Sequence, residues 1–189
     1  MKKFIGFCAC WISLFGCVSK PDSVESVKPF NLTQYMGKWY EIARLDNSFE
    51  RGLSHVTANY SLNSDGTLQV VNRGWDNSAS EWKEVMGKAK FVETPDQAYL
   101  KVSFWGPFYS SYIVFYLSPN YSTALVSGFN KSYFWILSRH KTLPKPQLDK
   151  LLNIAKQAGF DTKSLIYPDQ ENLPYTPVIT RLEHFNSSV

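Results

Sequence analysis

The chain is poor in cysteine and histidine, and it lacks the short motifs of the common enzyme classes. Its 189 residues include three cysteines and three histidines. The histidines, His55, His140 and His184, lie far apart and show none of the spacings that zinc ligands use. There is no Gly-x-Ser-x-Gly nucleophile turn and no phosphate-binding loop. We therefore expect no enzyme, no metal and no cofactor.

Clusters of positive charge are also missing. Lys and Arg number 20 against 16 Asp and Glu, which gives a formal net charge of +4. The excess shrinks further if Lys2 and Lys3 are removed with a leader segment. No run of basic residues is interleaved with aromatic ones, as a nucleic-acid surface would require. We expect no nucleic-acid partner.

The N-terminal segment, residues 1–16, has the pattern of a secretory leader. Two lysines precede an uncharged apolar stretch from Phe4 to Phe15, which is shorter than the ~20 residues that span a bilayer. Leu14-Phe15-Gly16-Cys17 follows and resembles the lipobox of bacterial lipoproteins, in which the cysteine is acylated after cleavage. There are two alternatives. Cys10 could be the acylated residue, or the segment could be a plain signal peptide followed by an incidental Cys17.

Cleavage before Cys17 would leave one cysteine in the mature chain. Cys8 and Cys10 would be lost with the leader, so no internal disulfide could form. Val18 stands where an Asp would retain a Gram-negative lipoprotein in the inner membrane, which favours the outer membrane. Residues 17–29 are polar and rich in Ser, Lys and Pro, which predicts a lipidated, flexible tether.

The rest of the chain is dominated by short segments in which apolar and polar residues alternate. Eight such segments are separated by turn residues, for example Asn63-Ser64-Asp65-Gly66. They cover 38–45, 56–62, 68–72, 88–92, 98–105, 112–117, 123–129 and 134–138. This succession predicts an all-β fold, an eight-stranded antiparallel up-and-down barrel. A barrel of eight strands can hold one small ligand.

A single helix is predicted after the strands, at about 144–158. Pro144 and Pro146 suit its first turn, and Gly159 suits its end. Its apolar stripe, which includes Leu148, Leu151 and Ala155, is expected to pack outside the barrel. Residues 165–167 resemble a short strand, and the extension 168–189 has no pattern to which a role could be assigned.

Two motifs at opposite ends of the strand pattern resemble those of the lipocalin family. Gly37-Lys38-Trp39 enters the first strand, as the family's Gly-x-Trp motif does. Arg139 follows the eighth strand, as does the arginine of the family's third motif. The resemblance implies that Trp39 plugs the closed end and that Arg139 stacks on its indole and caps backbone carbonyls. Ser118 replaces the Asp of the middle motif.

The resemblance covers residues 30–167 and is strongest to the bacterial and apolipoprotein D-like branch, which residues 100–108 also indicate. That branch implies an outer-membrane lipoprotein that stores or carries fatty acids or lysophospholipids for envelope maintenance. Homodimers occur in the branch, so a homodimer is possible, although no residue of this chain points to one.

Strand alternation predicts which side chains line the interior. With Trp39 inward, Glu41 and Ala43 would share its face, and motif alignment extends the set around the barrel. The expected ligand-binding residues are Glu41, Ala58, Tyr60, Tyr112, Val114, Tyr116 and Trp135. Any β-bulge would invert these orientations, and for each residue taken singly plain barrel packing is favoured over a ligand contact. An inward Glu41 needs a partner, which could be Arg139, Arg44 or a polar group of a ligand.

Two other functions agree with the same pattern. The barrel could bind a pigment or haem, which the aromatic-rich strands would permit. It could also be a structural envelope lipoprotein whose interior is filled by its own side chains.

Overall fold

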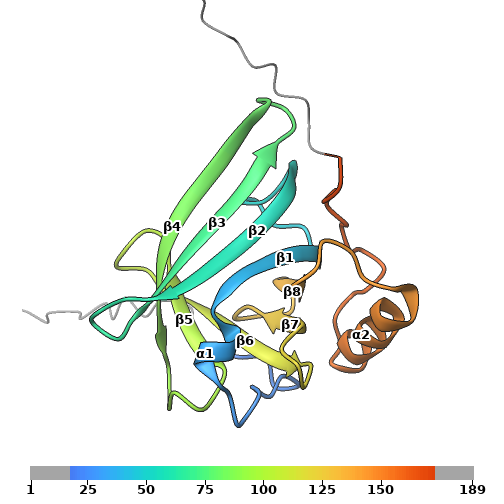
Figure 1. Cartoon of the computed structure of the whole chain (residues 1–189). Coiled ribbons are helices and arrows are strands. Elements are labelled where there is room, and N and C mark those ends of the chain that lie inside the picture. The colour runs from blue at the N-terminus through green and yellow to red at the C-terminus, as the bar shows by residue number, and fades with distance from the viewer. Residues whose placement is uncertain (1–17, 173–189) are drawn as a thin grey trace, which may run out of the picture.

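A computed structural model describes residues 18–172, so the leader, Cys17 and residues 173–189 lie outside the described range. Eight antiparallel strands, each paired with its neighbours in the sequence, form a closed barrel (Figure 1), which confirms the predicted fold. The strands are β1 (Gly37–Arg44), β2 (Leu53–Leu62), β3 (Leu68–Asp76), β4 (Glu81–Phe91), β5 (Tyr99–Ser103), β6 (Ser110–Leu117), β7 (Thr123–Ser127) and β8 (Phe134–Ser138).

The hairpin of β3 and β4 is longer than the sequence pattern indicates and extends beyond the other strands (Figure 1). The two strands pair from Leu68–Ala89 to Asp76–Glu81, whereas β4 pairs with β5 only from Lys88 onward. The outer half of β4 is therefore an edge, where side chains on both faces can meet solvent. Apolar and polar residues need not alternate there, which is why the alternation did not predict the outer half of the hairpin.

One helix, α2 (Lys145–Gln157), packs against the outside of the barrel as predicted. Its buried residues Leu151 and Ala155 join an apolar cluster with Phe134 and Phe160. A second helix, α1 (Leu32–Tyr35), lies at one end of the barrel and was not predicted, because four residues are too few to show a helical period (Figure 1). Within the described range, neither helix is long and apolar enough to cross a bilayer.

The described part of the expected tether is not flexible. Residues 18–29, here called the N-terminal strap, run along β6 and are fixed by burial and backbone hydrogen bonds. Val24 is fully buried. The Val27 N–H donates to the Val114 carbonyl at 2.8 Å, and the Val27 carbonyl accepts from Ala98 N–H at 2.9 Å. Three spaced valines in a polar stretch were too weak a pattern to predict this docking.

The up-and-down topology gives the barrel two distinct ends. The end that carries α1 and the β2–β3, β4–β5 and β6–β7 connections is called the base. The other end carries the β1–β2, β3–β4, β5–β6 and β7–β8 connections and is called the mouth. The N-terminal strap passes from the mouth, where Ser19 contacts Phe129, to the base, where Phe30 N–H donates to the Asp96 carbonyl.

Candidate ligand-binding site

Trp39 and Arg139 close the base of the barrel in the way the motif resemblance implies. Trp39 is fully buried, and the Arg139 guanidinium carbon lies 3.8 Å from the centroid of its ring. The guanidinium donates to four backbone carbonyls at 2.7–3.0 Å, those of Gln34, Tyr35, Met36 and Lys38. Gly37 has a φ of +88°, a conformation that favours glycine where the chain turns from α1 into β1.

Ser118 organises the β6–β7 loop although the family's Asp is absent. Its side-chain oxygen accepts hydrogen bonds from the backbone N–H groups of Ser122 and Thr123, both at 2.9 Å. A serine hydroxyl thus satisfies two backbone donors of the loop.

Three tyrosines form a hydrogen-bonded floor above Trp39. The hydroxyl of Tyr112 lies 2.6 Å from that of Tyr35 and 2.8 Å from that of Tyr60. Burial raises the pKa of all three phenols, so they stay neutral near pH 7. Tyr60 and Tyr112 were predicted to face inward, whereas Tyr35 belongs to the short helix that sequence reasoning missed.

Inward side chains above this floor are less completely buried than those at its level. Val114, which faces inward at the level of the floor, is fully buried, as is Trp39. The inward side chains nearer the mouth are only partly buried, although they pack on the interior cluster. They include Ala58, Val102, Phe104 and Trp135. Apolar and aromatic side chains dominate this upper wall, and a lining of that kind is suited to an apolar ligand.

Two β-bulges reverse part of the predicted inner surface. The pairing of β1 with β8 shifts between Glu41 and Ala43, and that of β6 with β7 shifts between Val114 and Tyr116. Ala43 and Tyr116 consequently face the outer cluster beneath α2, where Lys150 of α2 lies over the Tyr116 ring. The prediction that Tyr116 lines the interior is therefore wrong.

The same bulge turns Arg44 inward beside Glu41. Arg44 lies directly opposite Trp135 and Glu41 opposite Leu137, and both of these β8 residues face the interior. Arg44 Nη1 donates to Glu41 Oε1 at 2.5 Å, with both side chains almost fully buried. Of the partners considered for Glu41, the structure shows Arg44 and not Arg139.

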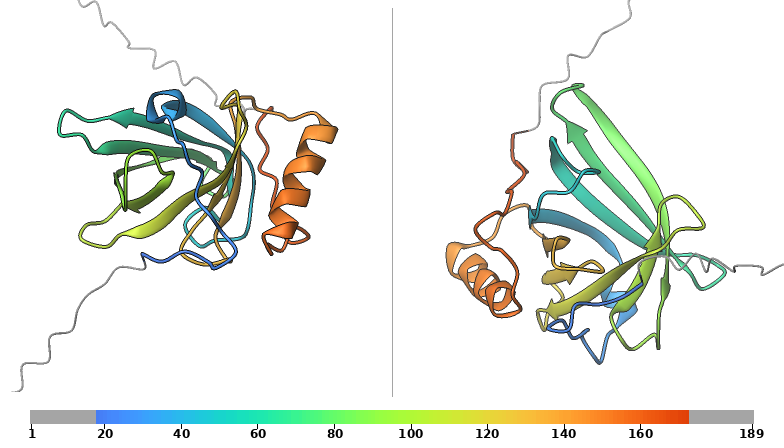
Figure 2. Two further views of the ribbon diagram at one scale, coloured as in Figure 1. Left: turned by 90° about the horizontal axis from the view of Figure 1, so that it is seen from below. Right: turned by 180° about the vertical axis from the view of Figure 1, so that it is seen from behind.

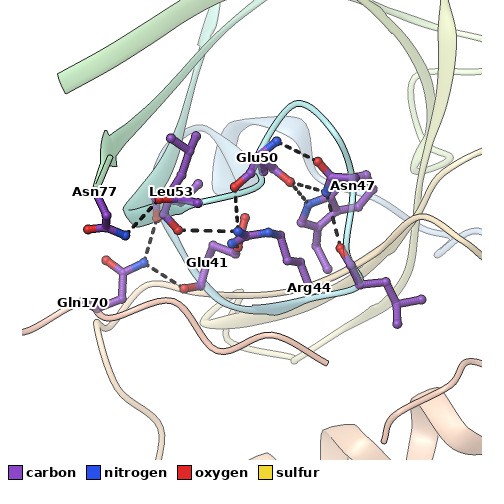
Figure 3. A network of polar contacts seen from close by, with 11 residues as sticks. Glu41, Arg44, Asn47, Glu50, Leu53, Asn77 and Gln170 are labelled. Atoms are coloured by element: carbon purple, nitrogen blue, oxygen red, sulfur yellow. Dashed lines mark hydrogen bonds and ion pairs between the residues drawn. The ribbon is translucent and has the colours of Figure 1, made fainter. Parts of the chain in front are cut away.

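The β1–β2 loop completes this polar cluster near the mouth (Figure 3). Arg44 Nη2 donates to the Glu50 carbonyl at 2.7 Å. The Glu50 carboxylate accepts from Asn47 Nδ2 at 2.6 Å and from the indole N–H of Trp135 at 2.9 Å. Burial, together with the nearby Glu50 carboxylate, raises the pKa of Glu41 to about 8 despite the guanidinium. At neutral pH the Glu41 carboxyl is therefore mainly protonated.

A segment beyond β8, residues 166–170, closes the gap between β1 and β2 next to this cluster. Arg44 and Ile166 exchange two backbone hydrogen bonds at 2.8 and 3.0 Å. The buried Gln170 amide donates to the carbonyls of Glu41 and Val56, both at 2.8 Å (Figure 3). Gln170 thus bridges two strands where their own pairing has ended. It lies in the extension to which sequence reasoning assigned no role.

Replacing Gln170 by Leu should lower the free energy of unfolding by about 2 kcal/mol, because two buried carbonyls lose their donor. Gln157→Leu, an exposed position on α2, is the matched control and should change it by less than about 0.5 kcal/mol. Urea denaturation of both variants measures the difference. Equal effects would show that the bridge contributes nothing.

Across residues 18–172, no group of His, Cys, Asp and Glu side chains is arranged to hold a metal ion. The profile of the Lipocalin-like domain family matches residues 30–170. The chain belongs to the lipocalin family. The matched range ends at Gln170, so the bridge between β1 and β2 lies within the family domain.

Named relatives place this lipocalin among bacterial lipoproteins. Outer membrane lipoprotein Blc of Vibrio cholerae is 53% identical over 163 residues, covering 86% of this chain and 95% of that protein. The Blc protein of Escherichia coli is 45% identical over 150 residues, covering 79% and 85%. Apolipoprotein D of Macaca fascicularis is 31% identical over 166 residues, covering 84% of each chain. These names confirm the predicted branch and the lipid-anchored location at the outer membrane of the cell envelope.

A solved structure supports the fold alone. Insecticyanin from the tobacco hornworm Manduca sexta superposes on this lipocalin with a TM-score of 0.63 at 22% identity, covering 79% of this chain and 85% of that one. At this identity the likeness concerns the barrel and not the ligand.

Proposed function

We propose that this lipocalin is a membrane-anchored carrier that binds the acyl chain of a fatty acid or lysophospholipid inside the barrel. The observation that carries the proposal is the partly exposed apolar wall above the tyrosine floor, which includes Ala58, Val102 and Trp135. Each methylene buried there would contribute ~0.8 kcal/mol. Family membership and the lipoprotein relatives support binding rather than catalysis.

The polar cluster near the mouth is the part of the site suited to the polar end of an amphipathic ligand. Arg44 Nε and the side-chain oxygen of Asn72 are buried without a hydrogen-bond partner among the described residues. Asn72 lies opposite the inward Ala58, so its oxygen is available to a ligand hydroxyl or amine. Such pairing would remove the cost of leaving a buried polar atom unsatisfied.

The anchor is proposed to be a lipid on Cys17, which lies outside the described residues. The leader, the lipobox-like Leu14-Phe15-Gly16-Cys17 and the lipoprotein relatives support this assignment. The homodimer stays a prediction.

The carrier proposal is tested by placing a large side chain on one inward-facing residue of the barrel. Ala58→Trp places an indole above the floor, so palmitoyl lysophosphatidylethanolamine and palmitic acid should bind at least about tenfold more weakly. Titration followed by native mass spectrometry gives the dissociation constants and the stoichiometry. We expect one ligand for each wild-type chain.

Two controls make the result specific. Thr57→Trp adds the same indole on the neighbouring residue of β2, which faces outward, and should leave affinity unchanged. Tyr116→Ser, on the outer face beneath α2, should also leave it unchanged. Wild-type protein that binds neither lipid would refute the carrier. A coloured, visibly absorbing protein would instead point to a pigment or haem, and an empty one to a structural barrel.

A further inference from the structure

The loop between β5 and β6, residues 104–109, carries large aromatic side chains outside the ligand-binding interior. Trp105 is 70% exposed and Phe108 is 61% exposed. Exposing an indole and a phenyl ring to water on one loop is unfavourable unless another surface covers them. Tryptophan in particular is enriched at the boundary between lipid headgroups and acyl chains.

The chain enters the described structure beside this loop. The Ser111 hydroxyl donates to the Ser19 carbonyl at 2.5 Å, and the Ser19 hydroxyl donates to the Phe129 carbonyl at 3.3 Å. Ser111 is the second residue of β6 and follows Phe108 by three positions. Both views in Figure 2 show the start of the described chain next to the β5–β6 loop.

This position limits where the lipid can be. Cys17 precedes Ser19 by two residues, and two residues span at most about 7 Å. Because the N-terminal strap is fixed, an acyl anchor on Cys17 would hold the mouth end, and this loop with it, close to the bilayer.

One lysine beside the loop, Lys101, adds a positive charge that no ion pair balances within the described range. Lys90 of β4 and Lys101 of β5 are directly opposite each other, a placement that repels within a sheet. The Lys101 ammonium lies 5.4 Å from the ring centroid of Tyr109, in the loop itself. Anionic headgroups would relieve this repulsion.

We propose that the β5–β6 loop docks on the anionic headgroup layer of the leaflet that holds the protein's own lipid anchor. Trp105 and Phe108 enter the interface, while Lys101 contacts a phosphate group. The proposal rests on the lipid attachment at Cys17 that belongs to the proposed function. It adds an orientation, with the mouth toward the bilayer from which a lipid ligand would come.

The acylated full chain, reconstituted into phosphatidylethanolamine vesicles with and without phosphatidylglycerol, tests the orientation. Phe108→Cys and Ser64→Cys each introduce one thiol for an environment-sensitive dye; Ser64 is exposed in the β2–β3 turn at the base. Dye at position 108 should lose about half of its emission to nitroxide-labelled lipid, and dye at position 64 should lose none. Phosphatidylglycerol should increase the quenching at position 108, and Lys101→Gln should abolish that increase.

The outcomes separate this proposal from the ligand assignment. Equal quenching at both positions, stronger quenching at position 64, or a mature chain without acyl mass on Cys17 would overturn the docking. Lipid titration of the same labelled proteins tests ligand binding independently. Trp105→Ser with Phe108→Ser should leave the affinity for lysophospholipid in solution unchanged while slowing its uptake from vesicles about tenfold. Unchanged uptake would also count against the docking.

Discussion

Replacing Arg139 by Met is expected to lower the free energy of unfolding by about 3 kcal/mol. The guanidinium donates to four backbone carbonyls around the base and covers the Trp39 indole. Methionine can replace the apolar contact but not the hydrogen bonds. Arg139→Lys should recover only part of the loss. The planar guanidinium carries several donors that reach different carbonyls at once, whereas the compact ammonium of lysine does not. Thermal and urea unfolding measure both variants.

Arg73→Met is the matched control. The Arg73 guanidinium carbon also lies over an indole, 4.4 Å from the Trp82 ring centroid, but it is exposed on the outer face. An exposed cation–π contact is worth about 0.5–1 kcal/mol. Similar losses for Arg73→Met and Arg139→Met would mean that stacking alone explains the motif and that the carbonyl cap does not matter.

The parts of this structure that the sequence predicted depend on local pattern. Strand alternation and turn residues sufficed for eight strands in an up-and-down barrel, and Gly37, Trp39 and Arg139 identified its closed end. These features repeat a short period or a short motif, so neighbouring residues carry the information. The inward positions of Ala58, Tyr60 and Tyr112 follow from the same alternation.

The parts that the sequence did not predict depend on partners distant along the chain. The inverted side chains of Ala43 and Tyr116 result from one extra residue in a strand pair, which alternation within one strand cannot reveal. Gln170 bridges β1 and β2 where the two strands separate, and its role therefore depends on residues far from it in the sequence. The N-terminal strap is likewise held by β6 and by the β4–β5 connection, while its own composition resembles a linker.

The Glu41 side chain is expected to make the folded protein more stable in mild acid than in mild alkali. Its ordinary pKa of 4.5 is raised to about 8, chiefly by burial and then by the Glu50 carboxylate. Between these values the folded protein holds a proton that the unfolded chain releases. The free energy of unfolding should therefore fall as the pH rises from about 5 to about 8, by at most about 1.4 kcal/mol per pH unit, and level off above that. Asp65 and Asp76, whose pKa values are lowered, contribute stability that is lost only in stronger acid.

Glu41→Gln isolates this effect, since a glutamine reproduces the hydrogen bonds of a protonated glutamate. Its oxygen can accept from Arg44 and its amide can donate to Glu50, which leaves Arg44 and Glu50 as the charged pair. We expect the decline between pH 5 and pH 8 to flatten and the variant to be as stable as wild type, or more so, at pH 8. The exposed Glu84→Gln should keep the wild-type pH profile. A loss of several kcal/mol at pH 7 in Glu41→Gln would contradict the assignment, because it would mean that Glu41 is ionised there and that its negative charge holds Arg44 in place.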